Sequence, residues 1–404
     1  MRYEIHNGEC AEVMASMEPE SVDAIVTDAP YGLSFMGAKW DSFGGSTGNQ
    51  TVSERQAEGK RYADENKGAP RYGNSHGKKV TQGEMVAFQE AMTPIFEEAL
   101  RVAKPGAHLL CFGGTRTFHR MACAIEDAGW EIRDCIMWTY GSGMPHGQRV
   151  ERLMEGRYPD EVAEWSGWNT ALKPAWEPVL VARSPLDGTV AHNVATYGTG
   201  AINIGACRIP TESHDPSRDG EATKDTRYTD RGATNFAAKP GPRGGDPRGR
   251  FPANLVHDGS DEVLACFPDS DGQIADRGAM SKSSVNCYGD YGADSAFVKR
   301  GDSGSAARFF YCAKASKKDR NRGGVNNNHP SVKPNDLMRW LVRLVCRPGG
   351  VVLDPFMGSG STGVACMDEG MDFVGIELDP HYCEIAEKRM AAANAETGQM
   401  ELAL

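Results

Sequence analysis

Two stretches of alternating strand and helix patterns, one at each end of the chain, constrain the fold more than any other feature. They cover residues 1–183 and 327–404, where short apolar runs alternate with segments of helical periodicity. Residues 184–326 between them are irregular and rich in Gly, Asp, Arg, Asn and Ser. Such alternation is typical of a parallel sheet covered by helices. We therefore predict an α/β fold with a doubly wound, mostly parallel sheet, whose two halves are separated in sequence by a loop-rich inserted domain.

A second irregular segment lies inside the first half. Between residues 37 and 83, Gly, Ser, Asn, Gln, Lys and Arg dominate and the hydrophobic periodicity disappears, which predicts a long mobile loop. The chain has 47 Gly and 22 Pro in 404 residues, more than an average globular protein. We expect this excess to lie in the two irregular segments.

The composition argues against several classes of protein. No apolar run approaches the roughly 18 residues of a membrane-spanning helix, and the first residues lack the apolar core of a signal peptide. The eleven cysteines contain no Cys-x-x-Cys pair, so neither a zinc ribbon nor a disulfide framework is expected. We predict a cytoplasmic protein with reduced thiols, no membrane contact and no metal site.

The net charge gives a mixed indication about partners. Lys and Arg number 44 and Asp and Glu number 55, which gives a net charge of −11. Proteins that bind nucleic acids usually present a basic surface, so this sum argues mildly against such a partner. A basic groove can nevertheless coexist with an acidic exterior.

One strand near the C-terminus is followed by a glycine-rich turn and a helix. The strand ends at Asp354, the turn contains Gly358 and Gly360, and Glu377 closes the next strand. Parallel sheets bind nucleoside cofactors at the carboxyl ends of their strands. Glycines have no side chain, so a ligand can approach the backbone closely. The acidic residue at the end of the next strand can accept hydrogen bonds from ribose hydroxyls. Neither a third glycine nor a P-loop lysine is present, which favours a cofactor without phosphates over a dinucleotide. The alternative is a tight turn that only packs a helix on a strand.

A polar tetrapeptide, Asp28-Ala29-Pro30-Tyr31, follows a buried strand near the N-terminus. Pro30 restricts Ala29 to an extended conformation, which would direct the Ala29 carbonyl outward beside the Asp28 carboxylate. Two convergent acceptors suit an exocyclic amino group, and Tyr31 could stack on a planar base. The alternative is a Pro-Tyr turn that simply ends the strand.

These segments resemble motifs of one enzyme family. The sequence Asp28-Ala-Pro-Tyr31 resembles the Asp-Pro-Pro-Tyr motif of S-adenosylmethionine-dependent DNA amino-methyltransferases, and the segment from Asp354 to Gly360 resembles their cofactor motif. The segment that starts His329-Pro-Ser resembles the stretch that precedes the cofactor motif in these enzymes. The order, with the catalytic motif first and an inserted region second, is that of the permuted β group. Ala29 departs from the family motif, as does Glu9, where relatives usually have Asp, but neither change removes a required atom.

The resemblance implies a set of site residues and a Rossmann-like methyltransferase sheet. The catalytic residues would be Asp28, Ala29, Pro30 and Tyr31. S-adenosylmethionine would be held by Glu9, Cys10, Asp28, His329, Ser331, Lys333, Asp354, Phe356, Gly358, Gly360, Ser361, Thr362 and Glu377. Residues 1–183 would form the catalytic half, 184–326 the target-recognition domain and 327–404 the cofactor-binding half.

The predicted function is site-specific methylation of the N6 amino group of adenine in a flipped-out base. Relatives that act on cytosine often have Ser at the position of Asp28, which favours adenine. Cytosine-N4 methylation, a non-catalytic DNA-binding relative, and methylation of RNA or a protein amide are the alternatives. The protein could serve a restriction-modification system or act as an orphan methylase, and many relatives form homodimers.

Double-stranded DNA is the expected partner, and we expect the protein to be associated with the nucleoid. Basic residues in the irregular segments could contact its phosphates: Lys39, Lys173, Arg243, Arg248, Arg250, Lys317 and Lys318. Three tryptophans, Trp165, Trp168 and Trp176, could border the flipped base, although packing in the core is the favoured interpretation. His257 and His329 have no partners at metal-ligand spacing.

Overall fold

The computed structural model describes residues 1–33, 41, 82–145, 147–156, 158–210, 248–271, 284–286, 289–291, 303–314 and 316–401. The loop expected at 37–83 therefore lies almost wholly outside the described residues. The chain divides into two compact units. Unit 1 comprises Met1–Asn203, Asn254–Ser260 and Cys312–Leu404, and unit 2 comprises Ile204–Ala253 and Asp261–Tyr311.

Unit 1 is built on a large sheet. Strands β1, β13, β12, β2 and β3 pair in parallel, as do β4 and β6, whereas β5 runs antiparallel to both of its neighbours, β3 and β4. The predicted α/β fold with a mostly parallel sheet is confirmed. The strands follow one another across the sheet in the order β1 (Tyr3–Asn7), β13 (Asp372–Glu377), β12 (Val351–Asp354), β2 (Val22–Thr27), β3 (Ala103–Phe112), β5 (Trp176–Arg183), β4 (Glu131–Thr139), β6 (Leu255–His257) and β11 (Tyr311–Cys312).

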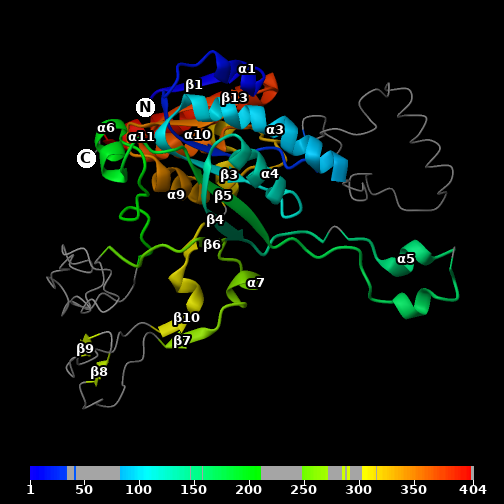
Figure 1. The fold of residues 1–404 in the computed structure, drawn as a ribbon. Coiled ribbons are helices and arrows are strands. Elements are labelled where there is room, and N and C mark those ends of the chain that lie inside the picture. Colours follow the sequence, from blue (N-terminus) through cyan, green and yellow to red (C-terminus); the bar gives the residue numbers. More distant parts are fainter. Residues whose placement is uncertain are drawn as a thin grey trace. The chain divides into compact units, whose positions relative to one another are not determined.

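Strands β2 and β12, from opposite ends of the chain, are neighbours in this sheet. They pair in parallel, with Val352 opposite Ala24 and Leu353 opposite Ile25. The chain leaves β12 toward β13 on one side and leaves β2 toward β3 on the other, so their junction is the topological switch point. In Figure 1 the blue N-terminal strand β1 accordingly lies beside the red C-terminal strand β13. The two strands that carry the motifs are therefore neighbours at the switch point.

Two groups of helices pack within unit 1. Helix α3 (Gln82–Val102) contacts α1 (Cys10–Ala15) and α4 (Phe118–Asp127), and α10 (Ser361–Glu369) contacts α9 (Asn335–Val345) and α11 (Pro380–Glu401). The inner face of α3 buries Phe88 and Phe96 completely or nearly so, and each large apolar side chain buried in this way contributes about 1.5–3 kcal/mol. Among the described residues, no helix combines the length and the apolar character that a bilayer crossing requires.

An arm of residues 140–175 joins β4 to β5. Its two extended segments are bridged between Arg149 and Asn169, and it carries α5 (Val150–Met154) and the short 3-10 helix η4 (Val162–Trp165) (Figure 1). Trp165 and Trp168 lie on this arm with 38% and 58% of their surface exposed. The expectation that these two tryptophans pack in the core is therefore wrong. Trp176 is partly buried, with its ring 6.2 Å from that of Phe118.

The described part of unit 2 contains only short elements. Its strands β7 (Asp269–Asp271) and β10 (Ser303–Ser305) pair antiparallel, as do β8 (Ser284–Asn286) and β9 (Gly289–Tyr291). It also contains α7 (Asp261–Leu264) and η6 (Ala306–Phe309).

Unit 2 covers fewer residues than the inserted region expected at 184–326. Residues 184–203, 254–260 and 312–326 group with unit 1 instead. They include α6 (Val190–Tyr197), β6, α8 (Lys317–Arg320) and η7 (Arg322–Gly324). The strand pairing of β6 with β4 explains why part of this region belongs to the sheet-bearing unit. The role of unit 2 in target recognition stays a prediction.

Candidate active site

The two predicted motifs meet at one edge of the sheet. Asp28 directly follows β2 and Asp354 is the last residue of β12, so adjacent parallel strands deliver both carboxyl groups to the same edge. The Thr27 hydroxyl donates a hydrogen bond of 2.6 Å to Asp354 Oδ1. This buried bond directly joins the strand before the Asp28 motif to the strand before the glycine-rich turn.

Asp28 belongs to a cluster of five polar side chains that we call the acid–lysine cluster: Asp28, Tyr31, Tyr140, Glu177 and Lys333. Lys333 Nζ lies 3.1 Å from Asp28 Oδ2 and 2.8 Å from Glu177 Oε2, and its side chain is only 8% exposed. The Tyr31 hydroxyl lies 3.0 Å from Asp28 Oδ1 and 3.1 Å from Glu177 Oε2. The Tyr140 hydroxyl donates to Glu177 Oε1 at 3.3 Å. Two carboxyl groups thus share one buried ammonium.

Burial and charge act in opposite directions within this cluster. Burial raises the pKa of Asp28, the Lys333 ammonium lowers it, and Glu177 raises it again. Burial alone would lower the pKa of Lys333, but Asp28 and Glu177 outweigh it and raise that pKa above the ordinary lysine value. Burial raises the pKa of Tyr31 well above its usual value and that of Tyr140 to about 12. Lys333 is therefore a cation and both tyrosines are neutral hydrogen-bond donors.

The structure changes the interpretation of Lys333. The resemblance implied a cofactor contact for this residue, but its described polar partners are Asp28, Glu177 and the Tyr31 hydroxyl. Its ammonium also lies 4.6 Å from the centre of the Phe112 ring, a distance typical of a cation–π contact. Lys333 thus lies beside the predicted catalytic residues Asp28 and Tyr31, and a cofactor contact stays a prediction.

Glu177 was given no role in the sequence analysis. It lies near the start of β5, and because β5 is antiparallel to β3, this start reaches the edge where the parallel strands end. The sequence offered one indication of Glu177, namely a charged residue just before the apolar run Val179–Ala182. Its partner could not be identified without the strand direction.

The Asp354 carboxylate braces the glycine-rich turn. Its Oδ2 accepts from the Thr362 hydroxyl at 2.6 Å, and its Oδ1 accepts from the Phe356 N–H at 3.1 Å as well as from Thr27. The residue is only 2% exposed, and burial raises its pKa to about 7. Asp354 and Thr362 therefore have an evident structural role, and direct cofactor contacts for them stay predictions.

Glu377 lies where β13 ends, beside this turn. Its Oε2 accepts from the Gly358 N–H at 2.9 Å and its Oε1 from the Asp379 N–H at 2.8 Å. Burial raises the pKa of this partly exposed carboxyl group. Each carboxylate oxygen can accept a second hydrogen bond, so Glu377 retains the capacity to bind ribose hydroxyls.

Glu9 lies near the end of the neighbouring strand β1, in which Asn7 is opposite Glu377. Its side chain caps helix α1, where Oε2 accepts from the Ala11 and Glu12 N–H groups at 2.9 and 3.2 Å. Cys10 follows, and burial raises the pKa of its thiol to about 12. The Glu at this position therefore has a capping role that its length permits, and its contact with a cofactor stays a prediction.

The two glycines of the turn are required by their surroundings. Gly358 and Gly360 have φ values of +52° and +79°, which L side chains rarely adopt. A Cβ on Gly358 would lie 2.8 Å from His329 Nε2, and one on Gly360 would lie 2.8 Å from the Ala386 Cβ. Burial lowers the pKa of His329 to about 4, so it packs against the turn as a neutral ring. His329, in the segment before α9, therefore lies directly against the turn.

A buried arginine that sequence reasoning missed supports the same turn. Arg389 on α11 is 1% exposed and donates to the Ser359 carbonyl at 2.5 Å and to the Asp319 carbonyl at 2.9 Å. Asn327 Nδ2 donates to Ser359 Oγ at 3.0 Å. Burial lowers the pKa of Arg389 to about 10. The turn is therefore held by α11 and by the segment before α9.

The donors and acceptors at this edge fit the nucleoside part of S-adenosylmethionine. A partly exposed carboxylate, Glu377, ends β13, and the adjoining backbone turn has no side chains at its two glycines. The remaining predicted contacts, Phe356 and Ser361 at the turn and the exposed Ser331 before α9, stay predictions. No phosphate-binding lysine lies in the turn, in keeping with a cofactor that lacks phosphates.

The residues expected to contact DNA are spread over both units. Lys173 is exposed, and its ammonium donates to the Gly141 carbonyl at 2.6 Å. In unit 2, Arg250 donates to the Arg308 carbonyl at 3.1 Å and lies over the Phe309 ring, and Arg248 is exposed. Lys39 and Arg243, and the side chains of Lys317 and Lys318, lie outside the described part of the chain. DNA contacts by these residues stay predictions.

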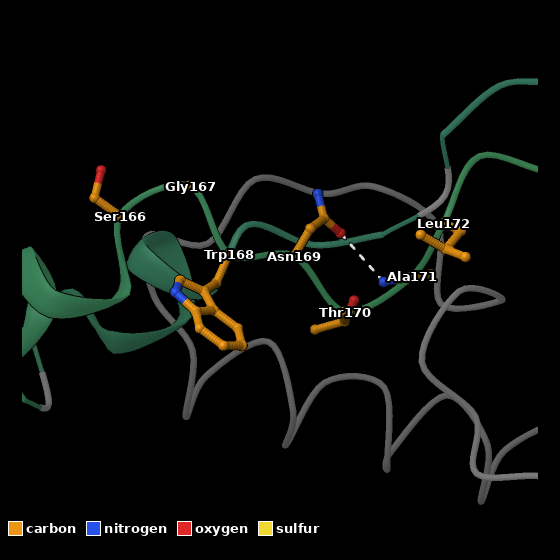
Figure 2. A pocket seen from close by; sticks show the side chains of 7 residues that line it. All are labelled: Ser166, Gly167, Trp168, Asn169, Thr170, Ala171 and Leu172. Carbon is orange, nitrogen blue, oxygen red and sulfur yellow. Dashed lines mark hydrogen bonds between the residues drawn. The ribbon is translucent and has the colours of Figure 1, made fainter.

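A surface pocket lies elsewhere, on the arm. Residues 166–172 line it, and Figure 2 shows the Trp168 and Leu172 side chains at its edge and the 3.3 Å hydrogen bond from the Ala171 N–H to Asn169 Oδ1. Leu172 is 92% exposed, and none of the lining residues carries a charge. In the part of the chain that the structure describes, no three His, Cys, Asp or Glu residues are grouped as metal ligands. The acid–lysine cluster is therefore the better candidate for chemistry.

We expect Glu377→Ala to weaken S-adenosylmethionine binding. Each charge-assisted hydrogen bond lost is worth about 1.5–3 kcal/mol, which predicts roughly a tenfold or greater increase in the dissociation constant measured by titration calorimetry. Glu387→Ala on α11 is the matched control, because Glu387 accepts a hydrogen bond from the Tyr3 hydroxyl at the exposed surface. Equal cofactor affinity in wild type and Glu377→Ala would show that this carboxylate does not bind the ribose.

Comparisons with known proteins find relatives of similar sequence. Type II methyltransferase M.HindIII of Haemophilus influenzae is 28% identical over 205 residues, which cover 49% of this chain and 64% of the relative. DNA adenine methyltransferase YhdJ of Escherichia coli is 37% identical over 67 residues, covering 17% of this chain and 23% of the relative. The chain thus spans less than two thirds of these curated relatives.

Solved structures align over most of the chain but at low similarity. The PvuII DNA methyltransferase, described as cytosine-N4-specific, aligns over 96% of this chain and 86% of its own, with 12% identity and a TM-score of 0.43. The model of the family described as DNA methylase matches residues 22–388, from β2 through part of α11. That match includes both motifs and the whole acid–lysine cluster, so the resemblance seen in the motifs is confirmed: this chain belongs to the N6/N4 DNA methylase family, whose methyl donor is S-adenosylmethionine.

Proposed function

We propose that this chain transfers a methyl group from S-adenosylmethionine to the N6 amino group of adenine in double-stranded DNA. The observation that carries the proposal is the pairing of β2 with β12 at the switch point. The strand that precedes Asp28 is thus next to the strand that leads into the glycine-rich turn, and the Thr27 hydroxyl donates a hydrogen bond to Asp354. A base amine held by Asp28 would therefore lie next to a cofactor held by the turn.

The exocyclic amino nitrogen of the base is a weak nucleophile, because its lone pair is delocalised into the aromatic ring. The enzyme must therefore make this nitrogen more nucleophilic. S-adenosylmethionine supplies a methyl group on a sulfonium, which is already a good leaving group. A hydrogen bond from the amine to Asp28 would localise the lone pair on nitrogen. Asp28 would then accept the N–H proton that the amine loses when its nitrogen takes the methyl group from the sulfonium. Alignment of the three atoms supplies much of the remaining rate enhancement.

The duplex imposes one further requirement. The amino group of a paired base lies inside the helix, so the base must be flipped out to reach Asp28. Basic side chains would hold the phosphate backbone while the base is extrahelical. Lys173, at the base of the arm, and Arg248 of unit 2 are exposed residues with that capacity.

Adenine is proposed over cytosine because of residue 28. A carboxylate accepts an amine hydrogen more strongly than the serine found in many cytosine-specific relatives, and one similar protein is named a DNA adenine methyltransferase. Cytosine-N4 transfer is the second candidate, since the matching family includes both N6 and N4 methylases. Both bases offer an exocyclic amine beside a ring nitrogen, so the same site geometry serves either.

The product identifies the target. DNA incubated with the purified protein and S-adenosylmethionine is digested to nucleosides and analysed by mass spectrometry, with Asp28→Ala as the inactive control. N6-methyl-deoxyadenosine is expected. N4-methyl-deoxycytidine as the sole product would overturn the adenine assignment, and no methylated nucleoside on DNA of varied sequence would overturn the proposed activity.

A further inference from the structure

One hydroxyl in the acid–lysine cluster has two competing acceptors. The Tyr31 hydroxyl lies 3.0 Å from Asp28 Oδ1 and 3.1 Å from Glu177 Oε2. A hydroxyl has a single proton to donate, and the Tyr31 oxygen itself accepts from Lys333 Nζ at 3.2 Å. Tyr31 can therefore donate a full hydrogen bond to only one of the two carboxyl groups at a time.

The contacts of Asp28 show what this competition affects. Its Oδ2 faces the Lys333 ammonium at 3.1 Å, and its Oδ1 faces the Tyr31 hydroxyl. Both oxygens thus already have a donor within the cluster. A base amine must then either share an occupied oxygen or replace one of these donors. Of the two, Tyr31 can be replaced at lower cost because its proton has a second acceptor close by.

We propose that Glu177 is a positioning residue that takes the Tyr31 hydrogen bond when a base amine binds, and so leaves Asp28 Oδ1 free to accept from the amine. The step is a rotation of the Tyr31 O–H bond, and no covalent bond forms or breaks. The inference rests on the proposed function, because it assigns Asp28 as the acceptor of the amine.

Glu177 has the capacity for this role. Its side chain is 20% exposed, its Oε1 accepts from the Tyr140 hydroxyl at 3.3 Å, and its Oε2 accepts from Lys333 at 2.8 Å. A carboxylate offers about four acceptor positions, so a full hydrogen bond from Tyr31 adds to these contacts without displacing them. Strand β5 is paired on both sides, with β3 and β4, which fixes the backbone that carries Glu177.

Lys333 keeps the exchange electrostatically balanced. Its ammonium contacts both carboxyl groups and the Tyr31 oxygen, so moving the hydroxyl proton from one acceptor to the other leaves all three Lys333 contacts in place. The aromatic rings of Phe112 and Trp138 lie 4.6 and 5.9 Å from Nζ and hold the ammonium in position. The only group that must move is therefore the hydroxyl hydrogen.

A double-mutant cycle tests the proposal. Methyl transfer to DNA and S-adenosylmethionine affinity are measured for wild type, Glu177→Gln, Tyr31→Phe and the double variant. We expect Glu177→Gln to lower kcat roughly tenfold to a hundredfold, with cofactor affinity unchanged. Tyr31→Phe keeps the ring but removes the competing hydroxyl, so in that background Glu177→Gln should cost much less. The coupling between the effects of the two substitutions on kcat decides whether Glu177 acts through the Tyr31 hydroxyl.

A glutamate in the same strand pair provides the control. Glu131 on β4 pairs with Arg183 on β5, away from the cluster, and Glu131→Gln should leave methyl transfer unchanged. If Glu177 merely anchors Lys333, Glu177→Gln would lower kcat by the same factor with the Tyr31 hydroxyl present and with it removed, which would overturn the proposal.

The failure of this inference is distinguishable from that of the proposed function. An active wild type with a fully active Glu177→Gln variant would overturn the inference alone. A wild type that methylates no DNA but binds S-adenosylmethionine would overturn the proposed function, and the inference with it.

Discussion

Asp28→Ala is expected to abolish methyl transfer while S-adenosylmethionine still binds. Losing the acceptor for the base amine should lower kcat by about 10³-fold or more. The fold should survive, because Lys333 keeps Glu177 as a partner at 2.8 Å. A tritium-transfer assay measures the activity, and calorimetry measures cofactor binding.

Asp28→Asn refines this test. The amide keeps one acceptor oxygen and nearly the same volume, so it separates the loss of charge from the loss of the side chain. We expect an activity between those of wild type and Asp28→Ala. Turnover at the wild-type rate in Asp28→Ala would refute the assignment of Asp28 as the acceptor of the amine.

Lys333→Met should have the largest effect on stability. It removes the one ammonium between two largely buried carboxyl groups, and breaking a buried ion pair in this way costs about 3–5 kcal/mol. Urea unfolding should show a lower midpoint at neutral pH. Adding Glu177→Gln should restore part of the stability, because one of the two unpaired carboxylates is then neutral.

The same substitution should move the acidic limb of the pH–activity profile. Asp28 must be ionised to accept a hydrogen bond from the amine, so activity is present above its pKa in the folded protein and is lost as the pH falls through it. Lys333 lowers that pKa against the effects of burial and of Glu177. Removing Lys333 therefore raises the pKa of Asp28, and the acidic limb should shift to higher pH.

Lys104→Met is the matched control for Lys333→Met. Lys104 pairs with the buried Asp23 at 2.8 Å, where β2 and β3 begin, whereas Asp28 follows the end of β2. Its loss should also lower stability but leave the pH–activity profile in place. An unshifted profile in Lys333→Met would mean that Lys333 does not set the ionisation of Asp28.

The positions of the helices and strands were largely predictable because their signals are local. The helical spacing of apolar residues over 335–345 predicts a helix, and the structure has α9 over Asn335–Val345 with Trp340 and Leu341 buried. The apolar run over 22–27 predicts a strand, and β2 covers Val22–Thr27. An amphipathic repeat or an apolar run is fixed by neighbouring residues, so no knowledge of distant partners is needed.

The three tryptophans show where local signals were insufficient. Trp165 and Trp168 are apolar residues that the sequence analysis placed in a core, yet they lie exposed on the arm. Apolar character indicates a tendency to be buried but does not identify a surface to pack against. The arm extends between β4 and β5 as two bridged segments, and that geometry depends on strand pairing.

The sequence by itself determined the fold class, the order of the motifs, and the two strand ends that carry Asp28 and Glu377, because each depends on a pattern within about ten residues. Only the tertiary structure decided that Glu177 and Lys333 meet Asp28. Lys333 lies in the opposite half of the chain from Asp28, and Glu177 reaches the site only because β5 runs antiparallel to its neighbours. Strand direction and the burial of a shared ammonium are properties of long-range packing, which no local pattern in this chain encodes.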